Sequence, residues 1–212
     1  MSADRLTSAH WYPGLSLGVV MLATTAILAL GQAGTADRIA QAVADDSRQQ
    51  LEQILPAGYA DNNLLADTLT LAGPDGQPLV VHRASKQGVL RAVLYEMSGH
   101  GYGGRIVLLM AVDTDGRIVG VRVTRHNETP GLGDRIEVAR NDWIRAFDGK
   151  SLQQPTPAHW SVKKDGGDFD QFAGATITPR AVVGIVRQGL EFFVAHRDEL
   201  LGQTGGQQEK RS

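Results

Sequence analysis

Apolar and polar residues follow different periods in different parts of the chain. Residues 12–36 contain no charged side chain, and Leu15–Leu30 is mostly apolar. Beyond this region, short apolar or alternating runs are separated by turns that contain Gly and Asp, which is the pattern of β-strands. Apolar residues then recur close to helical spacing over Arg180–Leu201. The pattern predicts an apolar N-terminal helix followed by an α+β domain.

The middle of the chain predicts an antiparallel sheet. Hairpin turns are indicated by Asp75-Gly76 and by Asp113-Thr-Asp-Gly116. A helix is expected over Ile136–Phe147, and a last helix follows Thr178, a suitable N-cap residue, with Pro179 at its first position. The expected strands are Thr68–Leu71, Pro78–Arg83, Val89–Met97, Arg105–Val112 and Arg117–Arg125.

The N-terminal apolar segment is long enough for a membrane helix. The hydrocarbon core of a bilayer requires roughly 20 residues of α-helix, and the uncharged stretch 12–36 supplies that length. A cleaved secretory signal peptide is the alternative, because small residues occur within Ala29–Ala33. Arg5 is offset by Asp4, which makes a poor positive leader, so an uncleaved anchor is favoured.

Composition excludes several classes of function. The 212 residues carry a formal net charge of −2 and show no basic stripe, which argues against a nucleic-acid partner. The absence of cysteine fits an oxidising compartment and leaves no ligands for an iron–sulfur cluster. The histidines show no metal-ligand spacing, so no metal site is expected.

The segment that carries chemistry is Asp170–Arg180, which ends a loop and begins the last helix. The start of a helix offers unpaired backbone N–H groups and a partial positive charge, and both suit a phosphate. Gly174 and Ala175 leave the backbone open to a bulky ligand. On spacing alone, an ordinary capped helix after a loop is the favoured interpretation.

This segment resembles the flavinylation motif of the covalent-FMN domain family. That motif reads Asp, two variable residues, Ser or Thr, and then Gly-Ala-Thr, with FMN joined to the last Thr by a phosphoester. The resemblance makes Thr176 the acceptor. Ala173 departs from the pattern, since the family usually has a hydroxyl there that could assist recognition by the attaching transferase. The cofactor-binding residues that this resemblance implies are Asp170, Gly174, Ala175, Thr176, Ile177 and Thr178.

A second segment, His126–Gly133, follows the last predicted strand directly. Its Pro and Gly residues alone indicate a turn into the next helix. The segment also resembles the second signature of the same family, a Glu-Thr-Pro-Gly-Leu-Gly loop that packs beside the flavin. Gly99–Gly104 similarly resembles a glycine-rich family segment that contains an aromatic residue. The contact residues implied by the second signature are Glu128, Thr129, Gly131, Leu132 and Gly133.

The resemblance covers nearly the whole chain and implies a membrane-anchored flavoprotein that relays electrons through covalent FMN. His126 and Glu128 lack a third group that would complete an acid–base site, so both are assigned to shaping the loop and no catalytic residue is expected. One anchor with one such domain resembles the G subunits of Rnf-type ion-translocating oxidoreductase complexes. The C subunits of sodium-translocating NADH:quinone reductases, which are usually longer, are the alternative. A membrane-tethered binding or scaffold domain without cofactor is the third hypothesis.

The same resemblance implies partners and location. The partners are the other membrane subunits of the complex and, during maturation, a flavin transferase. The location is the bacterial inner membrane, with the FMN domain on the periplasmic side. The expected organisation is a short cytoplasmic N-terminus (1–12), a transmembrane helix (13–34), an amphipathic linker helix (35–56), a covalent FMN-binding domain (57–202) and a tail (203–212) with a composition typical of disorder.

Overall fold

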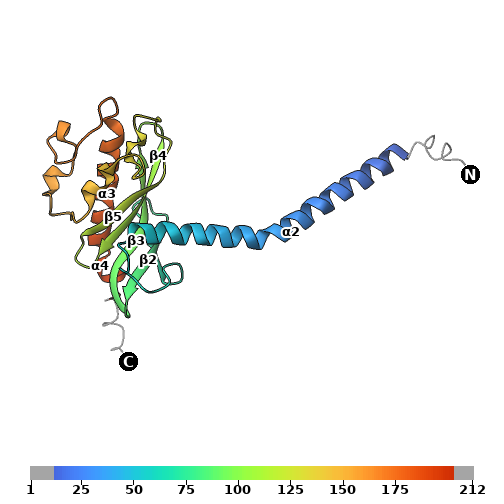
Figure 1. The fold of residues 1–212 in the computed structure, drawn as a ribbon, viewed down its shortest axis with the longest axis horizontal. Helices are drawn as coiled ribbons and strands as arrows, with labels where there is room; N and C mark the ends of the chain where they lie inside the picture. Colours follow the sequence, from blue (N-terminus) through green and yellow to red (C-terminus); the bar gives the residue numbers. More distant parts are fainter. Residues whose placement is uncertain (1–11, 203–212) are drawn as a thin grey trace, which may run out of the picture. The chain divides into compact units, whose positions relative to one another are not determined.

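The computed structural model describes residues 12–202. Within the first helix, the side chains of residues 12–13, 30–41 and 43–46 lie outside this description, as does the predicted tail, 203–212. The chain forms two compact units, Met1–Ser47 and Arg48–Ser212. Figure 1 shows the elements in chain order, with the described part of the first unit in blue.

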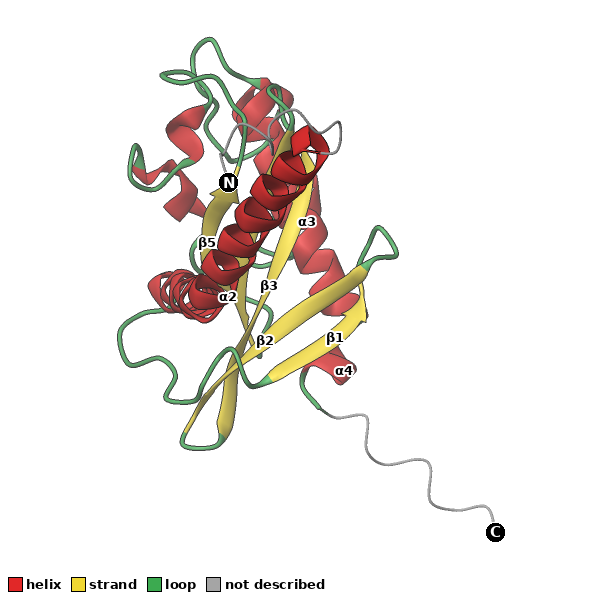
Figure 2. Ribbon diagram, turned by 90° about the vertical axis from the view of Figure 1, so that its right-hand side faces the viewer, coloured by secondary structure: helices red, strands yellow, loops and turns green. Residues whose placement is uncertain are grey.

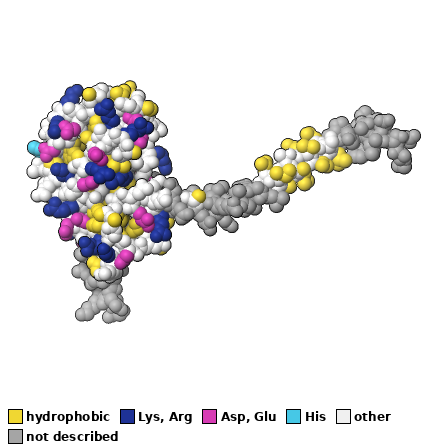
Figure 3. Space-filling view, in the orientation of Figure 1, with side chains coloured by type: hydrophobic (Ala, Val, Ile, Leu, Met, Phe, Trp, Pro, Cys, Tyr) yellow, Lys and Arg dark blue, Asp and Glu magenta, His cyan; other side chains and the backbone are white. Residues whose placement is uncertain are grey.

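One helix, α2 (Tyr12–Ile54), runs through the described part of the first unit and into the second. Eight large apolar side chains between Leu15 and Leu28 are each more than half exposed on it, and they form the yellow surface on this helix in Figure 3. Among the described residues, no helix has both the length and the apolar character that a membrane crossing requires. The predicted membrane segment, 13–34, and the predicted linker, 35–56, both contain residues without described side chains.

The second unit is built on a five-stranded antiparallel sheet in which each strand pairs with the next along the chain. Figure 2 shows the strands in yellow. The predicted sheet is confirmed, and each strand begins and ends within a few residues of its predicted limits. The strands are β1 (Thr68–Ala72), β2 (Pro78–Lys86), β3 (Val89–His100), β4 (Arg105–Asp113) and β5 (Ile118–Arg125).

Strand β4 is covered on both faces. Every residue from Ile106 to Val112 is buried, which explains why this part of the sequence is apolar without alternation. The strand ends in the predicted hairpin turn. There the Asp113 side chain accepts hydrogen bonds from the backbone N–H groups of Asp115 and Arg117, and Gly116 supplies a φ of +82° that favours glycine.

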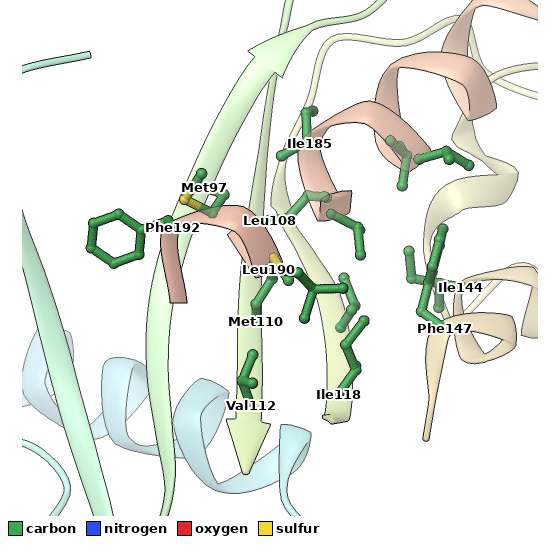
Figure 4. Packing of buried hydrophobic residues seen from close by; sticks show 14 of the residues in the cluster. Met97, Leu108, Met110, Val112, Ile118, Ile144, Phe147, Ile185, Leu190 and Phe192 are labelled. Atoms are coloured by element: carbon green, nitrogen blue, oxygen red, sulfur yellow. The ribbon is translucent and has the colours of Figure 1, made fainter. Parts of the chain in front are cut away.

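Helix α3 (Ile177–Ala195) covers one face of the sheet and buries its apolar side chains against β3 and β4, as Figure 4 shows. The close approach depends on Gly189, because an added Cβ would overlap the sulfur of Met110. The buried Tyr95 hydroxyl donates to the Gly189 carbonyl over 2.8 Å. This bond satisfies a polar group inside an apolar core.

The last turn of α2 covers the other face. Leu51 and Ile54 are buried there against a second, smaller cluster that includes Leu94 and Leu109. Gly120 of β5 permits this contact, because an added Cβ would lie 2.7 Å from the Ile54 carbonyl oxygen. The end of α2 is therefore part of the domain core.

The predicted helix over Ile136–Phe147 is wrong. Two short 3-10 helices, η1 (Asp134–Ile136) and η2 (Asp142–Phe147), occur instead, and both Glu137 and Asn141 adopt extended backbone conformations. The Asn141 side chain accepts a hydrogen bond from the Trp143 backbone N–H over 2.8 Å. This cap starts a new helix at that point, so the earlier one cannot continue through it.

The last predicted helix also differs at its ends. It begins at Ile177 rather than after Thr178, and it stops at Ala195 before a short helix, α4 (Arg197–Leu200). The loop that leads to it contains two more 3-10 turns, η3 (Pro157–His159) and η4 (Lys163–Asp165). This loop is held to the core by the rings of Trp160 and Phe169, which both stack on Phe147.

Candidate functional site

The two segments that the sequence singles out line one pocket. Its volume is about 380 Å³, which lies within the range of small-molecule sites, roughly 300–1,000 Å³. One wall is the loop after β5, and the other is the turn that precedes and begins α3. The lining residues are Tyr102, Glu128, Thr129, Leu132, Gly133, Gly174, Ala175, Thr176, Ile177 and Thr178.

The two threonines at the start of α3 have different environments. Thr176 occupies the N-cap position, is half-buried, and makes no capping hydrogen bond with its side chain. Thr178 lies inside the first turn, is 1% exposed, and donates its hydroxyl to the Glu128 carboxylate. The prediction that Thr178 caps the helix is therefore wrong, because its hydroxyl is bonded to a different loop.

Glu128 joins three segments of the pocket. Its Oε2 accepts from Thr178, and its Oε1 accepts from the Gly103 backbone N–H over 2.9 Å. Neighbouring glycines make room for the carboxylate. An added Cβ on Gly101 would overlap Oε1, and one on Gly133 would lie 3.0 Å from Oε2. Glu128 is 5% exposed, so nearly all of its side chain is inside the pocket wall.

His126 holds the backbone of Glu128 in place. Its Nδ1 accepts the Glu128 N–H over 3.1 Å, so the ring proton resides on Nε2, which donates to Glu137 over 2.7 Å. Arg140 bridges Glu137 and the buried Asp134, at 3.4 and 3.2 Å. These contacts tie the loop after β5 to η1 and to Glu137, whose backbone is extended.

Two of the residues expected at the site lie outside the pocket lining. The Asp170 carboxylate pairs with Lys163 at 2.7 Å, and the Asp170 carbonyl accepts from the Trp143 indole N–H over 2.8 Å. Gly131 has a φ of +78°, which serves the turn. Gly174 also has positive φ, +81°, but it does line the pocket. The structure brings the remaining expected residues together.

The turn Phe172–Thr176 is fastened from both sides. Within it, the Ala175 N–H donates to the Phe172 carbonyl over 3.1 Å, and the Phe172 ring meets the Trp143 ring edge-on at 5.2 Å. Asp165, earlier in the loop, makes a two-point ion pair with Arg180 in the first turn of α3, at 2.6 and 2.8 Å. The hydrogen bond from Arg180 lowers the pKa of the Asp165 carboxyl.

Exposed apolar side chains form the rim of the pocket. Tyr102 is 70% exposed, Ile177 48% and Leu132 44%. Exposed apolar surface beside a pocket suits a flat aromatic ligand. Tyr102 was not among the expected site residues, and its only signal is the glycine-rich stretch Gly99–Gly104. Gly103 in that stretch packs directly on the backbone of the loop after β5, where an added Cβ would overlap the Asn127 carbonyl oxygen.

The electrostatics of the pocket are simple. Among its lining residues, Glu128 is the one charged side chain, and no Lys or Arg lines it. Within the described residues, no group of three or more His, Cys, Asp or Glu side chains could hold a metal ion. The site therefore offers a hydroxyl, backbone groups, apolar surface and one buried carboxylate.

Comparisons with known proteins place this pocket in a family. Residues 101–191 match the family model described as FMN-binding domain. The G subunit of the ion-translocating oxidoreductase complex of Cereibacter sphaeroides is 51% identical over 188 residues, covering 89% of this chain and 86% of that protein. The same subunit of Pseudomonas aeruginosa is 46% identical over 192 residues, covering 88% and 90%. Among solved structures, Shewanella oneidensis NqrC is 26% identical, with a TM-score of 0.50, covering 69% of this chain and 73% of that one.

Proposed function

Because the chain belongs to the family of G subunits of ion-translocating oxidoreductase complexes, we propose that it is an FMN-carrying subunit that relays electrons within such a complex. The observation that carries the proposal is the pocket between the Glu128–Gly133 loop and the Gly174–Thr178 turn. Both walls lie within residues 101–191, the part of the chain that matches the FMN-binding domain family.

The residues of the pocket fit FMN. The apolar rim of Tyr102, Leu132 and Ile177 suits a flat aromatic ring, and the Thr176 hydroxyl at the pocket edge suits a phosphoryl group. When bound, FMN supplies the redox chemistry, because a flavin accepts and donates single electrons as well as pairs. The protein supplies attachment, orientation and electrostatics.

We further propose that FMN is attached covalently to Thr176 by a flavin transferase that uses FAD. The Thr176 hydroxyl oxygen forms a bond to the FMN phosphorus, and the phosphorus–oxygen bond to the AMP half breaks. AMP leaves with the bonding electrons, and the hydroxyl proton passes to a base of the transferase. Thr176 suits this role because it lines the pocket without capping the helix, whereas Thr178 is buried and bonded to Glu128.

The neighbours of Thr176 favour an anion at this place. Helix α3 begins at the next residue, and the partial positive charge of its N-terminus stabilises a phosphoryl group by about 0.3–1 kcal/mol. Asp170 has a different task in this proposal. Its carboxylate is exposed and lies outside the pocket lining, so we assign it to recognition by the transferase rather than to contact with FMN.

The N-terminal helix is proposed as the membrane anchor, over residues 13–34. Support comes from the large apolar side chains between Leu15 and Leu28, which are more than half exposed, because exposed apolar surface of this kind marks a membrane or protein interaction site. The helix that follows connects the anchor to the FMN domain, and the last part of the predicted linker, with Leu51 and Ile54, belongs to the domain core. The periplasmic placement of that domain and the partnership with other membrane subunits are carried over from the family resemblance.

Covalent labelling tests the proposed function. The full chain, produced together with a flavin transferase and run on a denaturing gel, should show a band that fluoresces under ultraviolet light. Intact mass spectrometry of the same sample should show one FMN added per chain. A chain without fluorescence and without added mass would overturn covalent attachment. Recovery of noncovalent flavin after denaturation would then show whether the pocket binds FMN at all.

A further inference from the structure

The Glu128 carboxylate is an unusual feature of this pocket. It lines a site whose other lining side chains are uncharged, and it is 5% exposed. Carboxylates are seldom buried so deeply unless a cation neutralises them. No Lys or Arg lines the pocket, so no lining residue neutralises Glu128.

Both oxygens of the Glu128 side chain are hydrogen-bonded. Each carboxylate oxygen has its own donor, the Gly103 backbone N–H for Oε1 and the Thr178 hydroxyl for Oε2. Two donors suit an ionised carboxylate, because that form only accepts hydrogen bonds. Two neutral donors hold the charge in position without cancelling it.

We propose that the buried charge of Glu128 lowers the midpoint potential of the flavin, in addition to joining the segments of the pocket. The inference rests on the proposed function, since it requires FMN in this pocket. A flavin that gains an electron beside a fixed negative charge is destabilised, and the low dielectric of a protein wall strengthens that effect relative to water. The charge therefore favours donation of electrons by the reduced flavin.

A purely structural role for Glu128 predicts a different pattern. If the side chain only holds three segments together, replacing Glu128 or replacing Thr178 should shift the midpoint potential in the same direction. A charge effect predicts different results for the two substitutions. Glu128→Gln removes the charge and keeps an acceptor for Gly103, whereas Thr178→Val keeps the charge and removes a donor that partly offsets it.

The test is a spectroelectrochemical titration of the covalently flavinylated full chain. Glu128→Gln should raise the midpoint potential, by an amount equivalent to roughly tenfold or more in the reduced-to-oxidised ratio at fixed ambient potential. Thr178→Val should leave the potential unchanged or lower it. The control is Glu137→Gln, which removes a carboxylate that contacts His126 but does not line the pocket, and which should shift the potential much less.

The outcomes separate this inference from the proposed function. A wild-type chain that takes up no flavin would overturn both. A labelled Glu128→Gln variant with the wild-type potential would overturn the inference alone, as would an equal shift in Glu137→Gln. If Glu128→Gln is not labelled, the Thr178→Val titration still decides when it is run at alkaline pH, where Glu128 stays ionised without the Thr178 donor: a potential above that of wild type at the same pH contradicts a charge effect.

Discussion

The Thr178 hydroxyl donates a hydrogen bond to the Glu128 carboxylate, which lies 50 residues earlier in the chain. This bond ties the first turn of α3 to the loop after β5, and both segments line the pocket. It also distinguishes two threonines that the sequence presents as near equivalents. Thr178 is buried and already bonded, while Thr176 lines the pocket edge.

The first prediction concerns these threonines. Thr176→Val should abolish covalent flavin fluorescence on a denaturing gel, because no hydroxyl remains for the phosphoester. Thr178→Val should retain the label but lower the free energy of unfolding by about 1.5–3 kcal/mol, since a hydrogen bond to a charged, buried partner is lost. Urea unfolding measures the second effect. A label that survives in Thr176→Val and disappears in Thr178→Val would reverse the assignment.

The second prediction uses two glycines of α3. Gly184 has no atom within 4 Å of an added Cβ, whereas one on Gly189 would overlap Met110. Gly184→Ala should therefore stabilise the domain by about 0.5–1 kcal/mol, because alanine favours a helix more than glycine does. Gly189→Ala should destabilise it by about 1–3 kcal/mol through overpacking. Urea unfolding of both variants is the measurement. Stabilisation by both would contradict the packing of α3 on the sheet.

The sheet could be predicted from the sequence because its signals are local. Asp113 and Gly116 form a hairpin turn with their own neighbours, and the strands on either side pair with each other directly. A meander of such hairpins needs no contact between distant parts of the chain to be recognised. The strand limits followed from the same local pattern.

The errors arose where a distant partner decides the outcome. Thr178 has the sequence of a helix cap, but Glu128 takes its hydroxyl. The segment after Ile136 has helical spacing, but Asn141 starts a separate turn and the His126 ring binds Glu137. Tyr102 reaches the pocket only because the glycines around it fold against another loop. No pattern within one segment contains that information.

The third prediction concerns the ion pair beside the acceptor turn. Arg180→Gln should speed hydrogen exchange of the backbone amides in Phe172–Thr176, because Asp165 then no longer fastens the loop to α3. Arg187→Gln is the control, since it breaks a similarly exposed pair with Glu191 within the same helix. Equal acceleration in both variants, or none in Arg180→Gln, would contradict a role for the pair in holding the turn.

Acid should reproduce the effect of Arg180→Gln. The hydrogen bond from Arg180 lowers the pKa of Asp165. The ion pair is therefore fully formed above the ordinary pKa of an Asp and is lost as the pH falls through the lowered value. Exchange in the acceptor turn, corrected for the intrinsic rate, should therefore become the same in wild type and Arg180→Gln at pH values well below about 4. A difference that persists there would contradict the assignment to Asp165.

The last prediction concerns alkaline pH. Burial raises the pKa of the Tyr95 hydroxyl, which donates to the Gly189 carbonyl inside the core. The contribution of this hydroxyl to the free energy of unfolding is complete below about pH 10. It is lost as the pH rises further, because Tyr95 ionises there in the unfolded chain and not in the native chain. Tyr95→Phe should cost about 0.5–1.5 kcal/mol at neutral pH. Urea unfolding should show that this difference shrinks above about pH 10, by up to about 1.4 kcal/mol per pH unit. A constant difference would mean that Tyr95 ionises equally in both states.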